Sequence, residues 1–220
     1  MSKNYADIPL FAHMSARDIR SVLHCVGAFT REYKKDEFIY LEEDRIDCVG
    51  CVIKGSVQII HENIWGDKAM LLAIGEKELF GESFCCGGSG ITAVSFTAKE
   101  ATTVLFLPFD RVVHTCPGAC AYHHQLVMNM ITVMAQKNAG LMAKIDILSK
   151  KTLREKIAAY LMNAASSHNA KYFTVPMGRI ELAEYLNADR SALTRELNAM
   201  KEEGFIDFEK NTFRILKEFS

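Results

Sequence analysis

The stretch that decides the fold is residues 180–213, which read IELAEYLNADRSALTRELNAMKEEGFIDFEKNTF. Apolar residues recur at helical spacing in two short segments of this stretch. They are Ile180, Leu182, Ala183 and Leu186 in the first segment and Leu193, Leu197 and Met200 in the second. Each set lies on one side of a helix, so the two helices are expected to bury these sides in one small core.

A tight polar joint separates the two predicted helices. Asn187 tolerates the left-handed backbone conformation that most residues avoid, and Asp189 is placed to cap the second helix by accepting its free amide hydrogens. Gly204 follows the last turn, where glycine commonly ends a helix. Two short helices with such a joint make a helix-turn-helix.

The second helix, about Arg190 to Glu203, has a polar face away from the core. This face carries Arg190, Ser191, Thr194, Arg195 and Asn198. Arginine forms bidentate pairs with guanine edges, while Ser, Thr and Asn bond to phosphates or base edges. Two short strands, 205–208 and 212–215, follow as a wing. An amphipathic helical pair with solvated charges is the alternative, but the cap, the arginine pair and the hairpin together favour a winged helix-turn-helix that reads double-stranded DNA.

Composition limits the class of protein. The 220 residues are 49% hydrophobic and 24% charged, as in an ordinary globular protein of one large or two modest domains. No apolar run approaches the roughly 20 residues that cross a bilayer, and the N-terminus lacks a signal-peptide core, so we expect a cytoplasmic protein without a membrane partner. Residues 149–220 hold 12 Lys and Arg against 10 Asp and Glu. This mild basic excess does not by itself establish nucleic-acid binding.

The part of the chain from about Phe29 to Pro108 is rich in short β-type runs. They include 48–53, 56–60 and 103–107, with glycines between the runs. Regularly spaced short strands favour a β-barrel or jelly roll.

From about residue 120 to 148 the pattern becomes helical. Spacings of four and three alternate along a coiled-coil seam of Val127, Ile131, Met134, Asn138, Leu141, Ile145 and Leu148. A single polar residue such as Asn138 commonly fixes the register or the number of partners. A helix lying on its own barrel is the alternative. We favour a parallel homodimer, because two recognition helices can then meet a two-fold symmetric site.

Several motifs, in their order and spacing, resemble the CRP/FNR transcription regulators. They are IKGSV at 53–57, FGE at 80–82, LSKK at 148–151, REL at 195–197 and EGFI at 203–206. The resemblance implies an α+β fold with an N-terminal double-stranded β-helix (jelly roll), a long dimerisation helix and a C-terminal winged helix-turn-helix. It implies an effector-sensing domain at 1–148, with the dimerisation helix at about 120–148, and a DNA-binding domain at 149–220.

The same resemblance indicates where an effector would bind. By position, the candidate groups are Gly81, Glu82, Ser83, Thr92 and, from the dimerisation helix, Asn138. Relatives that bind cyclic AMP carry an Arg-Ser or Arg-Thr pair shortly after the Gly-Glu turn, whereas residues 91–93 here read Ile-Thr-Ala. The cationic clamp for a buried phosphate is therefore missing, and a smaller or less charged effector is expected.

The recognition helix also departs from the family pattern. Arg190 and Arg195 match base-reading positions, but Ser191 replaces the acidic residue often found between them. The usual acceptor for a cytosine amino group is absent, so the family's half-site is not carried over. RNA polymerase is an implied partner if the protein is an activator.

Seven cysteines, an odd count, argue against a disulfide framework. Cys48 and Cys51 have metal-ligand spacing, but on a strand they point to opposite faces. Cys85 and Cys86 lie beside the expected ligand turn and are the candidate pair for a redox or metal-sensing function, although a buried cysteine is commonly just a small hydrophobe. No cysteine precedes Cys25, so the N-terminal iron–sulfur cluster ligands of the oxygen-sensing relatives are missing. No metal ligands are assigned.

Three histidines, His114, His123 and His124, lie near the start of the long helix and are candidate ligands for haem or a metal, although histidine there is usually solvated. No catalytic triad, phosphate loop or dinucleotide fingerprint can be assigned. The sequence therefore predicts an effector-controlled DNA-binding regulator and not an enzyme, with the cofactor left open. The alternatives are a redox, haem or metal sensor of the same architecture, and a ligand sensor whose output is a protein partner.

Overall fold

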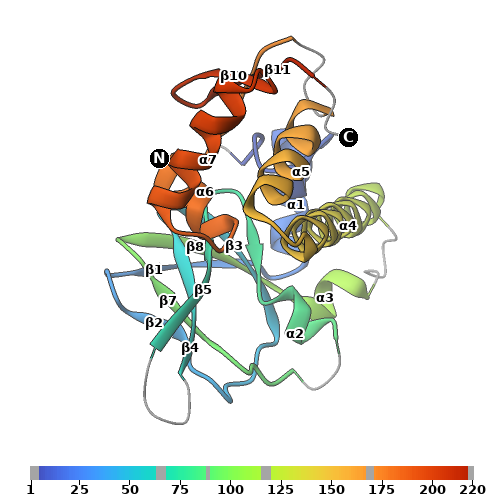
Figure 1. Cartoon of the computed structure of the whole chain (residues 1–220). Helices are drawn as coiled ribbons and strands as arrows, with labels where there is room; N and C mark the ends of the chain where they lie inside the picture. The colour runs from blue at the N-terminus through green and yellow to red at the C-terminus, as the bar shows by residue number, and fades with distance from the viewer. Residues whose placement is uncertain (1–4, 63–67, 88–89, 115–119, 167–170, 218–220) are drawn as a thin grey trace. The chain divides into compact units, whose positions relative to one another are not determined.

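The computed structural model describes residues 5–62, 68–87, 90–114, 120–166 and 171–217. The chain forms two compact units, Met1–Met134 and Ala135–Ser220, and the long helix α4 (Ala121–Ser149) belongs to both (Figure 1). Leu126 near its start lies in the core of the first unit, whereas Ile147 near its end lies in the core of the second. The functional boundary expected after residue 148 stays a prediction.

The first unit contains two four-stranded antiparallel sheets, ordered β1-β8-β3-β6 and β2-β7-β4-β5. The strands are β1 (Phe29–Tyr33), β2 (Phe38–Tyr40), β3 (Cys48–Lys54), β4 (Val57–Glu62), β5 (Lys68–Ile74), β6 (Leu79–Phe80), β7 (Ser95–Ala98) and β8 (Thr102–Pro108). The runs predicted at 48–53, 56–60 and 103–107 correspond to β3, β4 and β8. The jelly roll predicted from these runs is confirmed.

The side chains of β3 alternate between the two faces of its sheet. Cys48 and Val52 belong to the core between the sheets, while Val49 and Cys51 belong to the core on the outer face. Both cysteines are buried, so the expectation that they point to opposite faces is confirmed. Because both faces are covered, the strand reads as a nearly continuous apolar run.

Aromatic rings fill the space between the two sheets. The Phe80 ring lies 5.4 Å from that of Phe96 and 6.3 Å from that of Phe106, measured between centroids, and Tyr40 meets both Phe96 and Phe106 edge-on. Gly50 leaves room for this packing, since a β-carbon there would lie 2.4 Å from the Phe80 ring. The interior of the roll is therefore a packed core at these residues.

Short helices cover the outer face of the β1-β8-β3-β6 sheet. They are the 3-10 helix η1 (Pro9–Phe11), α1 (Ala16–Cys25) and α3 (Phe109–Val113), and α2 (Glu82–Cys85) follows β6. A capping box between Ser15 and Asp18 begins α1. Asn129, in α4, donates from Nδ2 to the carbonyls of Leu10 (3.0 Å) and Ala12 (2.8 Å). These bonds fix the first turns of α4 to the N-terminal segment.

The second unit is a helical core with a small sheet. Its further elements are α5 (Leu153–Ser166), β9 (Phe173–Thr174), α6 (Arg179–Tyr185), α7 (Arg190–Glu202), β10 (Ile206–Glu209) and β11 (Thr212–Ile215). The predicted wing is the hairpin β10–β11, drawn in red beyond α7 in Figure 1. The sequence did not predict β9, which pairs with β11 through Phe173 and Thr174.

Large apolar side chains remain exposed along α4. Ile131, Leu141 and Ile145 are 55%, 55% and 62% exposed, and Asn138 is exposed with them, whereas the remaining seam residues are partly buried. No helix in the described part of the chain, α4 included, is long and apolar enough to cross a membrane. The predicted helix is confirmed. Within a single chain, most residues of its seam are exposed to solvent.

Candidate DNA-binding surface and effector domain

Helices α6 and α7 form the predicted helix-turn-helix. Their inner sides are buried in one core that contains Leu182, Ala183, Leu186, Leu193, Leu197 and Met200. The joint is tight because Asn187 adopts φ = 50°, in the left-handed region, and Gly204 ends the second helix at φ = 73°. The roles expected of these two residues are confirmed.

Two details of the prediction are wrong. Ile180 is 57% exposed and does not join the core. At 100° per residue it lies roughly 110° around α6 from the centre of the buried stripe, outside the part that faces the core. Asp189 does occupy the N-cap position of α7, but its side chain makes no capping hydrogen bond. Its backbone carbonyl instead accepts from the Leu193 amide at 2.9 Å.

The outer face of α7 carries the expected polar side chains. Arg190, Ser191, Thr194, Arg195 and Asn198 are all exposed. Within the described residues neither Arg190 nor Arg195 forms an ion pair, so both guanidinium groups are available to another molecule. The Thr194 hydroxyl donates to the Arg190 carbonyl at 2.9 Å and can still accept from a ligand. Their expected exposure is confirmed, and their contacts with DNA stay a prediction.

Arg154, on α5, forms ion pairs with the side of α7 opposite its exposed arginines. Its Nε donates to Glu196 at 2.5 Å, and its two terminal nitrogens form a bidentate pair with Glu203 at 2.7 and 2.8 Å. These bonds lower the pKa of Glu203 and raise that of Arg154. The pairing partly offsets the charge of two carboxylates on the side of α7 away from the exposed arginines. No local sequence pattern predicts this pairing, because the partners are 42 and 49 residues apart.

Arg179 packs against the aromatic rings of the wing and bonds to its turn. Its guanidinium lies 5.0 Å from the centroid of Phe208 and 5.1 Å from that of Phe213, and Nη2 donates to the Lys210 carbonyl at 2.6 Å. Burial lowers the pKa of Arg179. Lys210, at φ = 50°, forms the wing turn with its side chain exposed. It is a further candidate phosphate contact that the sequence reading did not name.

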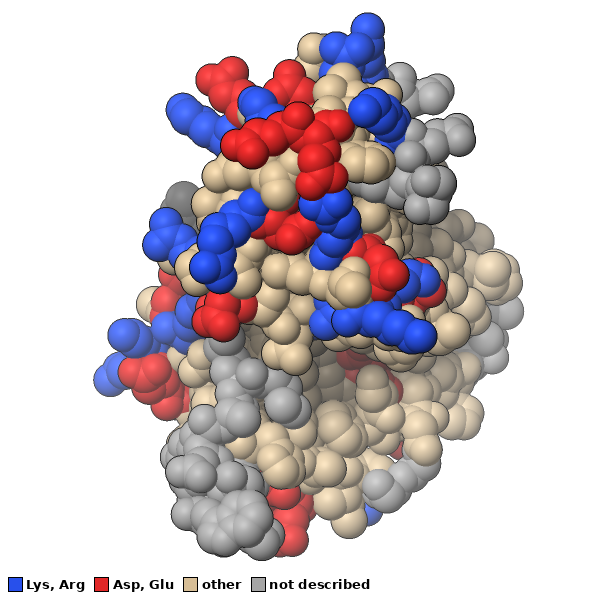
Figure 2. Space-filling model, in the orientation of Figure 1, with Lys and Arg blue, Asp and Glu red and all other residues tan. Residues whose placement is uncertain are grey.

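Charges of both signs are interspersed on the face of the molecule that Figure 2 shows. Lys and Arg side chains lie beside Asp and Glu side chains there, and no broad region of one sign is visible on that face. Lys201, for example, pairs with Asp207 at 2.7 Å. On this face, a contact with DNA would therefore rely on individual arginines and lysines rather than on a broad basic region.

The predicted effector-binding groups differ in their environments. Gly81, at φ = 80°, begins α2, Glu82 is buried, and Ser83 is exposed. Thr92 is buried, but its hydroxyl donates to the Val94 carbonyl at 2.7 Å and accepts from the Val94 amide at 3.1 Å. Thr92 thus stabilises its own turn. Gly81, Glu82 and Ser83 share one turn, and Asn138 is exposed on α4 in the second unit.

The described cysteines are not joined by disulfides. Burial raises the pKa of the Cys85 and Cys86 thiols, and it raises those of Cys48 and Cys51 to about 12. All four thiols are therefore protonated at neutral pH, when they are poor nucleophiles. A redox role for Cys85 and Cys86 stays a prediction that this environment disfavours. Cys116 lies outside the described residues.

Comparison with known proteins agrees with this architecture. The family model of the cyclic nucleotide-binding domain matches residues 30–116, and that of the Crp-like helix-turn-helix domain matches residues 155–218. The transcriptional activator protein FnrA of Stutzerimonas stutzeri is 26% identical over 191 residues, which cover 84% of this chain and 76% of that protein. The cyclic AMP receptor protein of Thermus thermophilus is 23% identical over 208 residues, which cover 94% and 92%.

Solved structures share the fold. A CooA mutant from Carboxydothermus hydrogenoformans aligns with a TM-score of 0.61 and 17% identity, covering 99% of this chain and 93% of the other. The two family models occupy the jelly roll and the winged helix-turn-helix in the order that the sequence motifs indicated. The chain therefore belongs to the CRP/FNR family of DNA-binding transcription regulators, which are not enzymes, and it carries an effector-binding domain before its helix-turn-helix.

Proposed function

We propose that this chain is a homodimeric transcription regulator, acting in the cytoplasm, whose DNA binding is controlled by an effector other than cyclic AMP. The observation that carries the proposal is the exposed face of α7. Arg190 and Arg195 are exposed there without ion pairs among the described residues, while Arg154 pairs with Glu196 and Glu203 on the other side. Arginines presented in this way can read guanine edges in a major groove.

A second copy of the chain is the proposed partner of α4. Ile131, Leu141 and Ile145 repeat at coiled-coil spacing and are more than half exposed. Asn138 lies in the same stripe and would fix the register of two helices. Large apolar side chains aligned along a helix are stabilised when a partner helix removes them from water. A parallel pair would carry two copies of α7, as a two-fold symmetric DNA site requires.

The control step is a change in how the two α4 helices pack. An effector in the first unit would favour one packing arrangement, and that arrangement would set the spacing of the two recognition helices. Such an effector must bind the two arrangements with different affinity, because equal affinity shifts no equilibrium. An activator of this kind would also contact RNA polymerase, and the similarity to FnrA, named a transcriptional activator, supports that possibility.

Cyclic AMP is disfavoured as the effector by the residues at its expected phosphate site. Ile91 is 51% exposed and apolar, and the Thr92 hydroxyl is engaged within its own turn. Neither residue supplies the charge that would offset a buried phosphate. The similarity to a cyclic AMP receptor protein therefore supports the fold and leaves the effector open.

The salt dependence of binding tests the DNA-binding output. The affinity of the full chain for a selected duplex should fall linearly with salt on logarithmic axes, with a slope of about −0.9 for each phosphate contacted. Fluorescence anisotropy at several salt concentrations measures this slope. A flat salt response together with tight binding to a protein partner would favour the alternative, in which the winged helix is a protein-interaction module.

A further inference from the structure

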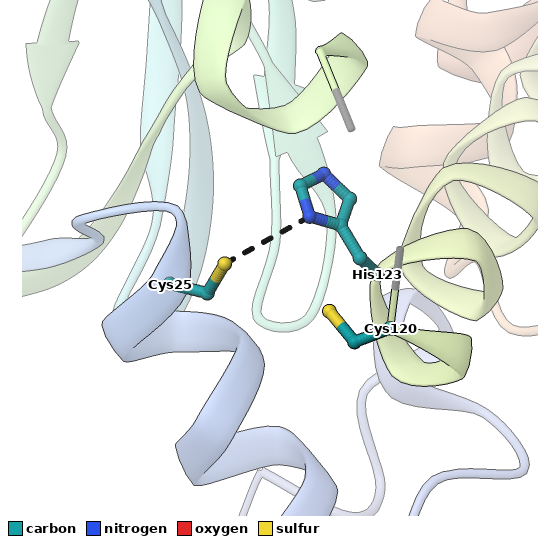
Figure 3. A group of neighbouring side chains, drawn as sticks. All are labelled: Cys25, Cys120 and His123. Carbon is teal, nitrogen blue, oxygen red and sulfur yellow. Dashed lines mark hydrogen bonds between the residues drawn. The ribbon is translucent and has the colours of Figure 1, made fainter. Parts of the chain in front are cut away.

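Two cysteines and a histidine from distant parts of the chain meet at the start of α4. Cys25 is the last residue of α1, Cys120 immediately precedes α4, and His123 lies in the first turn of α4. Figure 3 shows the imidazole ring and both sulfur atoms directed towards one shared space. One ligand atom from each residue lies within 4.8 Å of the other two. All three residues belong to the first unit.

The imidazole of His123 is oriented as in a metal-binding histidine. Its Nε2 lies 2.8 Å from the backbone carbonyl of Val112, in α3. A carbonyl can only accept, so Nε2 carries the hydrogen, and in the neutral ring Nδ1 keeps its lone pair. That nitrogen lies 3.9 Å from the Cys25 Sγ. Metal-bound histidines commonly donate their second ring N–H to a carbonyl in this manner.

The spacing of the three ligand atoms is compatible with a tetrahedral centre after small movements. Bonds of about 2.3 Å to sulfur and 2.0–2.1 Å to nitrogen place the ligand atoms of tetrahedral zinc roughly 3.5–3.8 Å apart. The Cys25–His123 pair, at 3.9 Å, is close to this range. The upper limit of 4.8 Å for the cluster means that closure around an ion requires movements of no more than about 1 Å.

We infer that Cys25, Cys120 and His123 bind one divalent transition-metal ion of the zinc class. Thiolate and imidazole are ligands that zinc prefers, whereas calcium and magnesium prefer oxygen. The three side chains leave a fourth position for water or a further ligand. His123 is buried, whereas Cys25 and Cys120 are only partly buried.

The site has a structural consequence for the long helix. A bound ion would join the end of α1 to the first turn of α4, next to the Val112 carbonyl of α3. The ion would then link α1 to α4 directly, while α3 would take part only through the bond from His123 to the Val112 carbonyl. An ion at this position would change how the first turn of α4 is held against α1. Regulation of DNA binding by that change rests on the proposed function.

Cobalt(II) is the probe that tests the site. Full-length protein, purified without oxygen under reducing conditions and freed of metal with a chelator, is titrated with Co²⁺ and then with Zn²⁺. The expected result is one Co²⁺ per chain, with visible bands of a four-coordinate centre and a thiolate charge-transfer band, both lost when Zn²⁺ displaces the cobalt. Iron and zinc quantified in the protein as purified identify the ion acquired in the cell.

Matched variants locate the ligands. Cys25→Ser, Cys120→Ser and His123→Gln should each lower cobalt affinity by more than the roughly 10–100-fold that loss of an outer-shell partner costs. His124→Gln and Cys86→Ser should retain the wild-type affinity and spectrum, since neither residue is in the cluster. Circular dichroism verifies folding. Because His123 also bonds to Val112, the two serine variants carry the test if His123→Gln does not fold.

Two results would overturn the assignment. One is wild-type protein that binds no stoichiometric cobalt while all its thiols are reduced. The other is unchanged cobalt affinity in both serine variants. Alkylation and mass measurement of the air-exposed protein show whether Cys25 and Cys120 form a disulfide. Such a disulfide, found together with no cobalt binding in the reduced protein, would mean that the cluster is a disulfide site and not a metal site. Protein that binds cobalt but no DNA contradicts the proposed function and supports the metal site. Protein that binds DNA but no cobalt contradicts the metal site alone.

Discussion

Replacing Ile145 by glutamate is expected to convert the chain from a dimer to a monomer and to abolish its specific DNA binding. Ile145 is 62% exposed and lies in the apolar stripe of α4 with Leu141. In a parallel pair of helices the substitution would bury two carboxylates close together. One uncompensated buried charge costs about 3–5 kcal/mol, which corresponds to a loss of affinity between the chains of roughly two to four orders of magnitude.

Analytical ultracentrifugation measures the dimer, and anisotropy with a duplex measures DNA binding. Met162→Glu is the matched control, because Met162 is also a large exposed side chain, 50% exposed, but lies on α5 outside the stripe. The control should remain dimeric and bind DNA normally. A dimeric Ile145→Glu variant would remove α4 as the interface and would favour a helix that contacts only its own chain.

Replacing Arg195 by alanine is expected to weaken specific DNA binding by about 1–3 kcal/mol, the usual range for a bidentate contact to a base. Arg195 is exposed on α7, and it takes no part in the Arg154 ion pairs that brace this helix. The fold and the dimer should therefore persist. The affinity for duplexes of unrelated sequence should fall much less, because a base contact contributes mainly to specificity.

The ratio of specific to non-specific affinity is the decisive measurement for Arg195. Lys151→Ala is a charge-matched control, since Lys151 is exposed and lies between α4 and α5, outside the recognition helix. Loss of a phosphate contact at Lys151 would weaken both affinities equally, so this control should leave the ratio unchanged. A ratio that also stays unchanged in Arg195→Ala would exclude Arg195 from base recognition.

Periodicity explains why the core of the DNA-binding unit was predictable. Leu193, Leu197 and Met200 recur along a helix of thirteen residues, long enough to define a buried stripe, and all three are fully buried. The preceding helix has seven residues, and this length does not distinguish the buried Leu182 from the exposed Ile180 by pattern alone. The placing of Cys48 and Cys51 on opposite faces was predictable because strand geometry alone determines it.

Contacts between distant parts of the chain could not be predicted from the sequence. Cys25 and His123 are 98 residues apart, and neither lies in a short ligand motif with the other. The sequence indicates His123 only as one of three histidines near the start of a helix, where a histidine is usually solvated. Its burial and its bond to the Val112 carbonyl depend on how α1, α3 and α4 cover the sheet. No local pattern contains that information. The same holds for Arg154 and its two carboxylates.

Selection of binding sites from a random duplex library tests the central claim most directly. The full-length chain is used, and the enriched sequences are aligned without assuming symmetry. A homodimer with one recognition helix per chain predicts a two-fold symmetric site whose half-sites are centred one helical turn apart, about 10–10.5 base pairs. Enrichment of a single unpaired half-site, or no enrichment at all, would contradict the account of this chain as a dimeric reader of DNA.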